Sequence, residues 1–457
     1  MKLDKDIIKA RLKDCLGLDS RASKIVVVGL GATGISVARF LMDLGFEFVV
    51  ADSREHVVSE QLREELAAIE IVTGKFDEAL FSQATHLIVS PGVALTEKAI
   101  AAAISKGVEV VGDIDLFVCS VNAPIIAITG SNGKSTVTTM VGEMASAAGI
   151  KVGVGGNLGI PALDLLKQPA ELYVLELSSF QLERTRHLNA LAATVLNVSA
   201  DHLDRHTSVA DYAEQKQRVF MGSEVMVINV DYPIVAAMQE QGRSTITFSI
   251  INKADFYIAE NAGIEYLMHG EKPLLALSEL PLEGRHNAAN ALAALALGVA
   301  AGFDEQAMCK VLKHFKGLEH RMQRVAEIGG VIWVNDSKAT NIGACVAALQ
   351  GYQHKVILIA GGDAKGADMN ELVPAVKAKA KGVVIMGKDA ALIEQAIDGC
   401  VPVYKAENMQ QAVRIAASIA EVGESVLLSP ACASLDQYKN YQDRGDKFVQ
   451  AVLELIA

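Results

Sequence analysis

The chain has 457 residues, 51% of them hydrophobic and 5% aromatic, and a formal net charge of −12 at neutral pH. This acidic balance argues against a general binder of nucleic acid or of an anionic membrane surface. No apolar run reaches the roughly 18 residues that span a bilayer, and residues 1–24 lack a secretory signal, so we expect a cytoplasmic protein without membrane insertion. The 6 cysteines are scattered, without a C-x-x-C pair, as expected for small buried residues in a reducing compartment.

The first elements predict an N-terminal helix and a nucleotide-binding unit. Apolar residues at helical spacing favour a helix packed on the surface of the first domain or, alternatively, a partner-binding helix; they are Leu3, Ile7, Ile8, Leu12 and Leu16. A strand at 24–28 then leads into Gly29-Leu30-Gly31-Ala32-Thr33-Gly34, and Asp52 follows a second strand at 47–51. This spacing is the dinucleotide fingerprint. Because any nucleotide diphosphate can use the same geometry, the motif alone does not decide between NAD and another diphosphate.

The second unit opens with a phosphate loop. An apolar run at 125–128 ends in Gly130-Ser131-Asn132-Gly133-Lys134-Ser135-Thr136, and a helix-like segment follows. Glycines let backbone N–H groups close round a phosphate, the lysine offsets charge, and the serine hydroxyl can bind Mg²⁺. The first glycine of the common G-x-x-x-x-G-K-[ST] pattern is replaced by Ile128. Strand, turn and helix still occur in the required order, so we predict phosphate binding here.

Polar clusters follow later strands. Glu176 ends a strand at 172–177, the position where P-loop folds place an acid that completes Mg²⁺ coordination. The segment Asp201-His202-Leu203-Asp204-Arg205-His206 offers further metal ligands, although His202 alone could equally be structural. Residues 245–283 are less regular and predict a small β subdomain, and a helix is expected at 288–301.

A third unit, with strands at 331–334, 356–360, 383–386 and 425–428, completes an α/β pattern typical of parallel sheets. Lys338 and Lys365 lie at strand ends, the usual ligand edge of such sheets, and suit a substrate with carboxylates. Two nucleotide-type sites in consecutive units favour transfer or ligation between two bound molecules over hydride transfer.

These motifs, in this order, resemble the Mur ligase family from about Lys24 onward. The resemblance also rests on Gly156-Asn157-Leu158-Gly159, Glu176-Leu177-Ser178-Ser179-Phe180-Gln181-Leu182, His286-Asn287, His320-Arg321, Asp336-Ser337-Lys338-Ala339-Thr340-Asn341 and Ser429-Pro430-Ala431-Cys432-Ala433-Ser434-Leu435-Asp436. The family loop resembles T-G-x-N-G-K-[ST], which accounts for Ile128. The segment 336–341 is similar to that of the member that adds D-glutamate. The N-terminus looks longer than in most members.

The resemblance implies three domains, which we place at 1–112 (Rossmann-like, binding the UDP-linked substrate, with an N-terminal extension at 1–22), 113–317 (P-loop ATPase-like) and 318–457 (Rossmann-like, binding the amino acid). It implies ATP-dependent addition of D-glutamate to UDP-N-acetylmuramoyl-L-alanine through an acyl phosphate, a cytoplasmic step of peptidoglycan precursor synthesis. The cofactors would be ATP and Mg²⁺, with a CO₂-derived carbamate on Lys216, and the enzyme is expected to act as a monomer.

Roles carried over by resemblance are as follows. Catalytic residues would be Lys134, Glu176, His202 and Lys216, and metal ligands Ser135, Glu176, His202 and the Lys216 carbamate. ATP would be bound by Gly130, Ser131, Asn132, Gly133, Lys134, Ser135, Thr136, Asn287, Arg321 and Asp336. The UDP-sugar would contact Thr33, Asp52, Ser53, Arg54, Gly92, Asn157, Ser178 and Gln181, and D-glutamate Lys338, Thr340, Lys365, Ser434 and Tyr441.

Three alternatives stay open at this point. A folylpolyglutamate synthetase also adds glutamate, but a pterin binder has little need of the diphosphate unit at Gly29–Asp52. A Rossmann dehydrogenase would use that unit for NAD, and the ATP loop argues against it. A nucleotide-binding regulatory protein would not require Lys134, Glu176 and Lys216 together.

Overall fold

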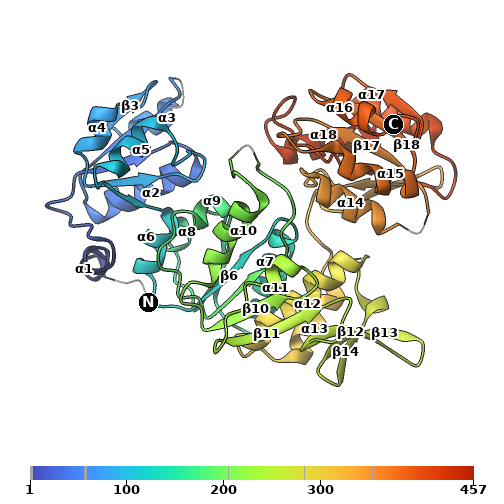
Figure 1. The fold of residues 1–457 in the computed structure, drawn as a ribbon, viewed down its shortest axis with the longest axis horizontal. Helices are drawn as coiled ribbons and strands as arrows, with labels where there is room; N and C mark the ends of the chain where they lie inside the picture. The colour runs from blue at the N-terminus through green and yellow to red at the C-terminus, as the bar shows by residue number, and fades with distance from the viewer. Residues whose placement is uncertain (1–3, 56–58, 204, 283, 353, 457) are drawn as a thin grey trace.

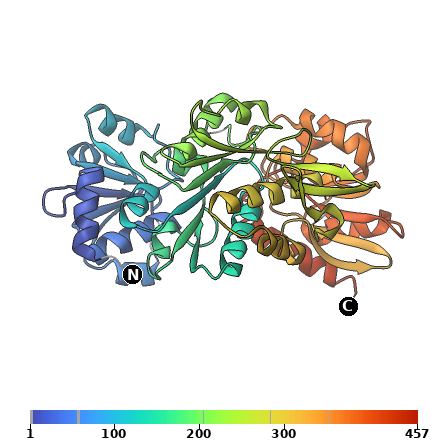
Figure 2. The same ribbon diagram turned by 90° about the horizontal axis from the view of Figure 1, so that it is seen from below.

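Three sheets organise the chain. The computed structural model describes residues 4–55, 59–203, 205–282, 284–352 and 354–456. Helices and strands alternate along most of this length, and each sheet forms the centre of a separate α/β domain (Figure 1). Figure 2 shows the domains in a row in chain order, with the two termini towards opposite ends. The predicted three-domain α/β fold is therefore confirmed.

The first sheet is parallel, with the order β3-β2-β1-β4-β5. Its strands are β1 (Ile25–Val28), β2 (Phe48–Asp52), β3 (Glu70–Thr73), β4 (His86–Val89) and β5 (Glu109–Val111). The chain runs outward from β1 to β3 and then returns to the other side of β1. The loops after β1 and β4 therefore flank a topological switch point, where such sheets bind ligands.

The second sheet has the order β14-β13-β12-β11-β10-β9-β6-β8-β7. Its strands are β6 (Ile125–Thr129), β7 (Val152–Gly156), β8 (Leu172–Glu176), β9 (Ala192–Val195), β10 (Val225–Asn229), β11 (Ser244–Ser249), β12 (Phe256–Asn261), β13 (Ile264–His269) and β14 (Lys272–Ala276). The strands from β7 to β12 pair in parallel, and β13 and β14 are antiparallel additions. Residues 245–283 are thus β-structured, as predicted, but they extend the main sheet through backbone pairing.

Helices α7 (Lys134–Ala147) and α12 (Arg285–Ala300) pack against each other and against the second sheet. Their aliphatic residues join those of β6 and β8 in one buried cluster. α12 is the helix predicted at 288–301, and it begins three residues earlier. The tight packing fixes the start of α7, and hence the phosphate loop, against the sheet.

The third sheet has the order β15-β16-β20-β17-β18-β19, in which β15 runs antiparallel to β16 and the other neighbours pair in parallel. Its strands are β15 (Gln323–Ile328), β16 (Val331–Asn335), β17 (Val356–Gly361), β18 (Ala380–Met386), β19 (Val403–Lys405) and β20 (Ser425–Leu428). Helix α18 (Tyr441–Leu453) covers β15 and β16. The carboxyl ends of β16, β17 and β20 lead into the loops that carry the predicted D-glutamate residues.

One hydrophobic cluster extends across the first two domains, and each of them also has a cluster of its own. Helix α1 (Lys5–Leu16) packs against α6 (Asp113–Ser120), which leads into the second domain. A single buried cluster joins Leu12 of α1, Val27 of β1, Phe117 of α6 and Leu175 of β8, whereas the third domain has clusters of its own. The predicted helix at the N-terminus is thus present. It contacts the second domain as well as the first, Ile7 is 48% exposed, and Leu3 lies outside the described residues.

Candidate active site

A cleft of about 1220 Å³ lies between the second and third domains. Its walls are the phosphate loop, the start of α12 and the loop that follows β16. The predicted residues that line it are Ser131, Asn132, Gly133, Lys134, Thr136, Asn157, Glu176, Ser178, His202, Lys216, Asn287, Arg321, Asp336, Lys338 and Thr340. Predicted ATP, metal and D-glutamate residues therefore share one space, although they come from distant parts of the chain.

Two glycines shape the phosphate loop. Gly130 (φ +150°) and Gly133 (φ +83°) both adopt backbone conformations that other residues avoid. A Cβ atom on Gly133 would lie 2.4 Å from Oδ1 of Asn290. The backbone N–H of Asn132 donates to Oδ1 of Asn197, 2.8 Å away. The loop is thus held by neighbouring side chains with its N–H groups at the start of α7, where the helix dipole favours an anion.

Two buried lysines meet at one carbonyl oxygen of this loop. Nζ of Lys134 donates to the oxygens of Gly130 and Ser131, both at 2.8 Å, and Nζ of Lys216 donates to Gly130 at 2.9 Å. Burial lowers the pKa of Lys134, and burial together with the charge of Lys134 lowers the pKa of Lys216 far below its ordinary value. Lys216 therefore has an unusually large neutral fraction for a lysine.

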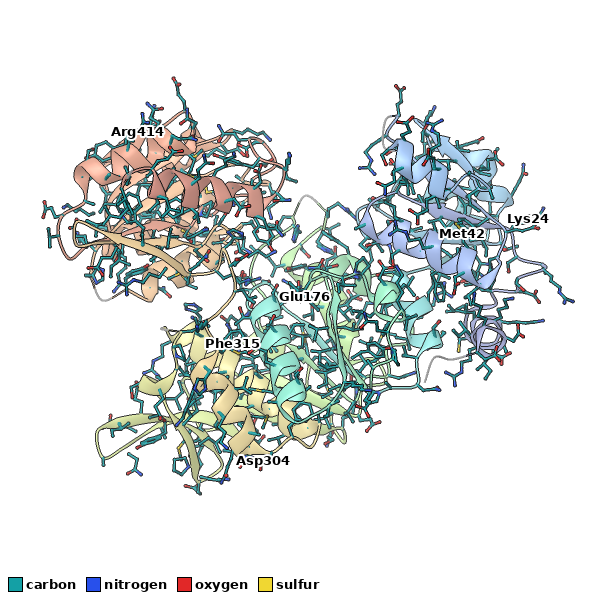
Figure 3. The ribbon with its side chains drawn as sticks, turned by 180° about the vertical axis from the view of Figure 1, so that it is seen from behind. Lys24, Met42, Glu176, Asp304, Phe315 and Arg414 are labelled. Atoms are coloured by element: carbon teal, nitrogen blue, oxygen red, sulfur yellow. The ribbon has the colours of Figure 1, made fainter. Side chains whose placement is uncertain are left out.

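Glu176 supplies a buried carboxylate at the end of β8. Figure 3 shows it near the middle of the molecule, in the second domain. Its Oε1 accepts from Nδ2 of Asn157 at 2.7 Å, and its Oε2 is buried without a hydrogen-bond partner among the described residues. Burial raises the pKa of Glu176, but the charge of Lys134 and the Asn157 hydrogen bond outweigh it, so the pKa falls below the ordinary value. An unpartnered anionic oxygen in a cleft is suited to a cation.

Asp201 and His202 follow β9, which lies on the other side of β6 in the sheet from β8, the strand that ends in Glu176. Burial lowers the pKa of His202 to about 4, which leaves its imidazole neutral and able to ligate a metal. His202 has a left-handed backbone (φ +56°), and its N–H donates to Oδ1 of Asp201. Asp204, quoted in the same motif, lies outside the described residues.

Asp201 joins the second domain to the third. Its Oδ1 accepts from Nζ of Lys365 at 2.7 Å, and its Oδ2 accepts from Nδ2 of Asn341 at 2.9 Å. Lys365, a predicted D-glutamate residue, does not line the cleft in this arrangement but is held at its edge.

Arg321 and Asp336 approach the nucleotide side of the cleft from the third domain. Nη2 of Arg321 donates to Oγ of Ser135 at 2.9 Å across the domain boundary. Oδ2 of Asp336 accepts from Ser429 at 2.9 Å, and burial raises the pKa of Asp336 to about 7. Two predicted ATP residues from the third domain thus lie beside the predicted phosphate loop.

Lys338 makes a cation–π contact with the ring of Tyr441. Its Nζ lies 4.0 Å from the ring centroid of Tyr441, and burial with the charge of Arg321 lowers its pKa to about 7. The backbone N–H of Thr340 donates to the oxygen of Lys338. Ser434 is buried after β20 and does not line the cleft. The predicted amino-acid residues are therefore close in the third domain but are not all turned into the cleft.

The predicted UDP-sugar residues gather at the switch point of the first sheet. A Cβ atom on Gly34 would lie 1.7 Å from the oxygen of Gly29, so helix α2 (Ala32–Leu44) can approach β1 because residue 34 has no side chain. Oδ2 of Asp52 accepts from the N–H of Leu30 at 2.7 Å and from Nη2 of Arg54 at 2.8 Å. Asp52 is buried and holds Arg54 and the glycine loop, whereas Thr33 is half-buried and Ser53, Arg54 and Gly92 are exposed.

Ser178 and Gln181 form a capping box at α9 (Ser179–Leu182). Nε2 of Gln181 donates to Oδ2 of Asp113 at 3.0 Å. Gln181 is buried, and its side-chain amide is hydrogen-bonded at the junction between the first two domains. Of the three residues predicted to lie near the reactive end of the UDP-sugar, only Ser178 and Asn157 line the cleft.

Several groups in the site had not been given a role from the sequence. Asn197 and Asn290 contact the phosphate loop, and Asn341 donates across the domain boundary to Asp201, for which the sequence had suggested metal binding but no bridging role. Asn197 lies two residues after β9, and Asn290 lies about one helical turn after Asn287, so their positions in the sequence could have indicated both residues. Burial raises the pKa of the Cys432 thiol to about 12, and we predicted no nucleophilic role for this residue.

Among the described residues no three His, Cys, Asp or Glu side chains cluster as a metal site. No helix in the described part of the chain is long and apolar enough to cross a membrane.

Comparisons with known proteins cover nearly the whole chain. Three family models match in order: the Mur ligase MurD-like N-terminal domain at 23–112, the Mur ligase middle domain at 128–298 and the Mur ligase glutamate ligase domain at 320–432. The UDP-N-acetylmuramoylalanine–D-glutamate ligase of Methylococcus capsulatus is 53% identical over 96% of both chains. The corresponding ligase of Marinobacter nauticus is 48% identical over 93% of this chain and 97% of its own.

Solved structures share the fold at low identity. A pseudomurein peptide ligase type C from Methanothermus fervidus has a TM-score of 0.63 at 20% identity, covering 95% of this chain and 100% of its own. A folylpolyglutamate synthase from Mycobacterium tuberculosis has a TM-score of 0.56 at 17% identity, covering 74% and 91%. The fold is thus common to several ligases, and the sequence relatives distinguish among them: this chain belongs to the UDP-N-acetylmuramoylalanine–D-glutamate ligases of the Mur ligase family.

Proposed function

We propose that the enzyme is an ATP-dependent carboxylate–amine ligase that joins D-glutamate to UDP-N-acetylmuramoyl-L-alanine, with ADP and phosphate as the other products. This reaction is a step of peptidoglycan precursor synthesis and takes place where ATP and nucleotide-linked sugars are made, in the cytoplasm. The observation that carries the proposal is the shared cleft, in which a phosphate loop and a buried carboxylate face the lysine-bearing loop of the third domain. The groups invoked all come from one chain, so the mechanism is compatible with a monomer.

The first step is phosphoryl transfer. The carboxylate of the UDP-linked substrate attacks the γ-phosphorus of ATP, the bond to the β–γ bridging oxygen breaks, and ADP and an acyl phosphate form. The loop N–H groups at the start of α7 and the ammonium of Lys134 hold the phosphates, so that positioning and electrostatics lower the barrier. Nζ of Lys134 donates to the carbonyl oxygens of Gly130 and Ser131, and a bound phosphate would take their place as the acceptor. Asn287, Arg321 and Asp336 would contact the rest of the nucleotide.

The donor set fits Mg²⁺. Ser135, Glu176, His202 and a carbamate on Lys216 would hold it, and the unpartnered Oε2 of Glu176 supports this assignment. When bound, Mg²⁺ would supply positive charge for the phosphate oxygens. Free CO₂ reacts with a neutral amine, and the strongly lowered pKa of Lys216 provides one. The resulting carbamate is an anion, whereas the unmodified ammonium would repel a cation.

Amide formation completes the reaction. The neutral amine of D-glutamate attacks the acyl carbon and forms a tetrahedral intermediate. The nitrogen then loses a proton to solvent, the bond between the carbon and the phosphate oxygen breaks, and phosphate leaves with the bonding electron pair. Lys338, Thr340, Lys365, Ser434 and Tyr441 would hold the amino acid, with the ammonium groups opposite its carboxylates. At the other end, Thr33, Asp52, Ser53, Arg54 and Gly92 would bind the UDP moiety, with Asn157, Ser178 and Gln181 nearer its reactive carboxylate. The domain bounds 1–112, 113–317 and 318–457 remain part of this proposal.

The test measures phosphate release from ATP with UDP-N-acetylmuramoyl-L-alanine and, separately, D-glutamate, L-glutamate, L-alanine and meso-diaminopimelate. We expect turnover with D-glutamate to exceed that with each other amino acid by at least about 100-fold, since a site built for one stereoisomer leaves polar groups unpaired with the other. Equal rates with L-glutamate or L-alanine would reject the assignment. Folylpolyglutamate synthesis is tested in parallel with a reduced folate in place of the UDP-linked substrate, and no phosphate release is expected.

A further inference from the structure

We propose that Arg444 is a positioning residue that holds the three loops of the D-glutamate site in register. The inference rests on the proposed function, because it concerns the binding of the acceptor amino acid. Arg444 lies on α18, does not line the cleft, and is 2% exposed. It therefore acts through its neighbours and not by touching substrate.

The guanidinium of Arg444 contacts all three loops. Nε donates to Oγ of Ser337 at 3.0 Å and Nη2 donates to the Ser337 carbonyl oxygen at 2.8 Å. Nη1 donates to the carbonyl oxygens of Cys432 at 3.1 Å and Gly361 at 3.4 Å. Ser337 and Cys432 belong to the segments that follow β16 and β20, and Gly361 is the last residue of β17, where the third loop begins.

Each of these segments carries a residue of the proposed amino-acid site. Ser337 precedes Lys338, Gly361 lies four residues before Lys365, and Cys432 lies two residues before Ser434. A shift in any acceptor would therefore move a residue of the proposed D-glutamate site. Since a misplacement of about 1 Å can cost a site as much as 100-fold in rate, the link between loops matters for function as well as for stability.

Arg444 also connects the loops to the aromatic wall of the site. Oγ of Ser337 donates to the carbonyl oxygen of Tyr441 at 2.8 Å, and the ring of Tyr441 lies below the ammonium of Lys338. Nδ2 of Asn335 donates to the carbonyl oxygen of Gly445 at 3.2 Å. The start of α18 is thus tied to the end of β16 by side chains on both sides of Arg444.

Arginine suits this place better than lysine. Its planar fork presents donors in fixed directions, so one side chain can serve separate carbonyl groups, whereas a lysine ammonium acts as a single point. Burial lowers the pKa of Arg444 to about 10, which keeps it charged at neutral pH. The carbonyl oxygens of Ser337, Gly361 and Cys432 stabilise this charge by accepting its hydrogen bonds.

The experiment compares Arg444→Lys and Ser337→Ala with the wild-type enzyme in steady-state assays that vary one substrate at a time. We expect the KM for D-glutamate to rise by about tenfold or more in Arg444→Lys and by a smaller factor in Ser337→Ala. The KM values for ATP and for the UDP-linked substrate should stay within about twofold. Lys447→Met is the matched control, because it removes an exposed cation from the same helix, and it should leave all three constants unchanged.

A second measurement separates positioning from general damage. Single-turnover ADP formation from ATP and the UDP-linked substrate is measured without D-glutamate, and we expect both variants to match the wild type in this half-reaction. The inference is overturned if the KM for D-glutamate is unchanged, or if all three KM values and the half-reaction deteriorate together. Should Arg444→Lys fail to fold, Ser337→Ala carries the test alone. Failure of the proposed function would be distinct, since the wild type itself would then show no D-glutamate-dependent turnover.

Discussion

Nζ of Lys365 lies 2.7 Å from Oδ1 of Asp201, and this ion pair joins the third domain to the second. Its side chains are 18% and 7% exposed, so water screens the pair only weakly. Oδ2 of the same carboxylate also accepts from Asn341 of the third domain. Asp201 is therefore the point on the second domain where two groups of the third domain converge.

Loss of this ion pair should favour separation of the two domains in the ligand-free enzyme. In Asp201→Asn and in Lys365→Met we expect a larger radius of gyration by small-angle X-ray scattering than in the wild type. The double variant should expand no further, because either single change already removes the contact; a coupling of about 1–3 kcal/mol in a double-mutant cycle of unfolding is expected. Lys388→Met is the control, since it breaks an exposed pair with Asp363 inside the third domain. Additive effects, or equal expansion in the control, would contradict the bridge.

Removal of the Lys216 amine should abolish turnover. We expect Lys216→Ala to lose about 1000-fold or more in kcat, as for loss of a charged group from a catalytic site, with partial recovery in formate or acetate, whose carboxylate can enter the vacated space. Lys216→Arg keeps a cation that cannot be carbamylated and should not recover. Incubation with ¹³C-bicarbonate should give a carbamate signal by ¹³C NMR in the wild type alone. Full activity of Lys216→Ala would reject the carbamate.

Neutralising Glu176 should weaken metal dependence without disturbing the fold. Glu176→Gln keeps an oxygen that can accept from Asn157 but loses the anionic charge opposite Lys134. We expect the Mg²⁺ concentration for half-maximal activity to rise by about tenfold or more, as for a damaged metal site, while the unfolding midpoint changes little. Glu143→Gln, exposed on α7, serves as the control. An unchanged Mg²⁺ requirement would show that Glu176 is not a ligand.

Asp113 should make stability depend on pH. Burial raises its pKa from 3.8 to about 6, so between these values the folded state binds more protons than the unfolded state, and stability falls as the pH rises through about 6. The buried charge at pH 8 then costs at most about 3 kcal/mol. Asp113→Asn keeps an acceptor for Gln181, and it should raise the free energy of unfolding at pH 8 by about 1–3 kcal/mol.

The gain from Asp113→Asn should shrink towards pH 4, where the wild-type carboxyl is protonated in the folded state. Urea unfolding at pH 4, 6 and 8 measures the difference directly. A constant difference across this range, or a loss of stability at pH 8, would mean that Asp113 is ionised and satisfied in the fold.

Sequence reasoning located most of the strands inside each sheet, whereas β11, β12 and β13 of the second sheet were expected only as part of a small β subdomain. β3, β7, β15 and β19 were not predicted, and each one is an edge strand. Edge strands are half exposed and mix polar with apolar residues, as in the Gln323–Ile328 strand, so their hydrophobic pattern is weak. Central strands such as Val356–Gly361 are buried on both faces and form continuous apolar runs.

The candidate site shows a similar division. Residues in contiguous motifs, such as Lys134 and Glu176, were predicted by position, because the order strand, loop and helix determines where their side chains lie. No motif in the sequence marks Arg444, which is one arginine in an ordinary amphipathic helix. Its proposed role depends on contacts with loops that lie up to 107 residues away along the chain. Likewise, the sequence spacing alone predicts that Lys216 is a solvent-exposed lysine on a helix. In the structure the side chain is buried, and its Nζ donates to the carbonyl oxygen of Gly130.

The hydrophobic cluster that the first two domains share affects how the three domains can move relative to one another. Because one buried cluster includes both Leu12 and Leu175, we expect the first two domains to move as one body. The switch-point loops of the first sheet and the phosphate loop of the second would then keep a fixed distance from each other. The third domain, with separate cores, joins this body through one covalent segment after Phe315 (Figure 3). We therefore expect a ligand bound in the cleft to restrict movement of the third domain relative to the other two.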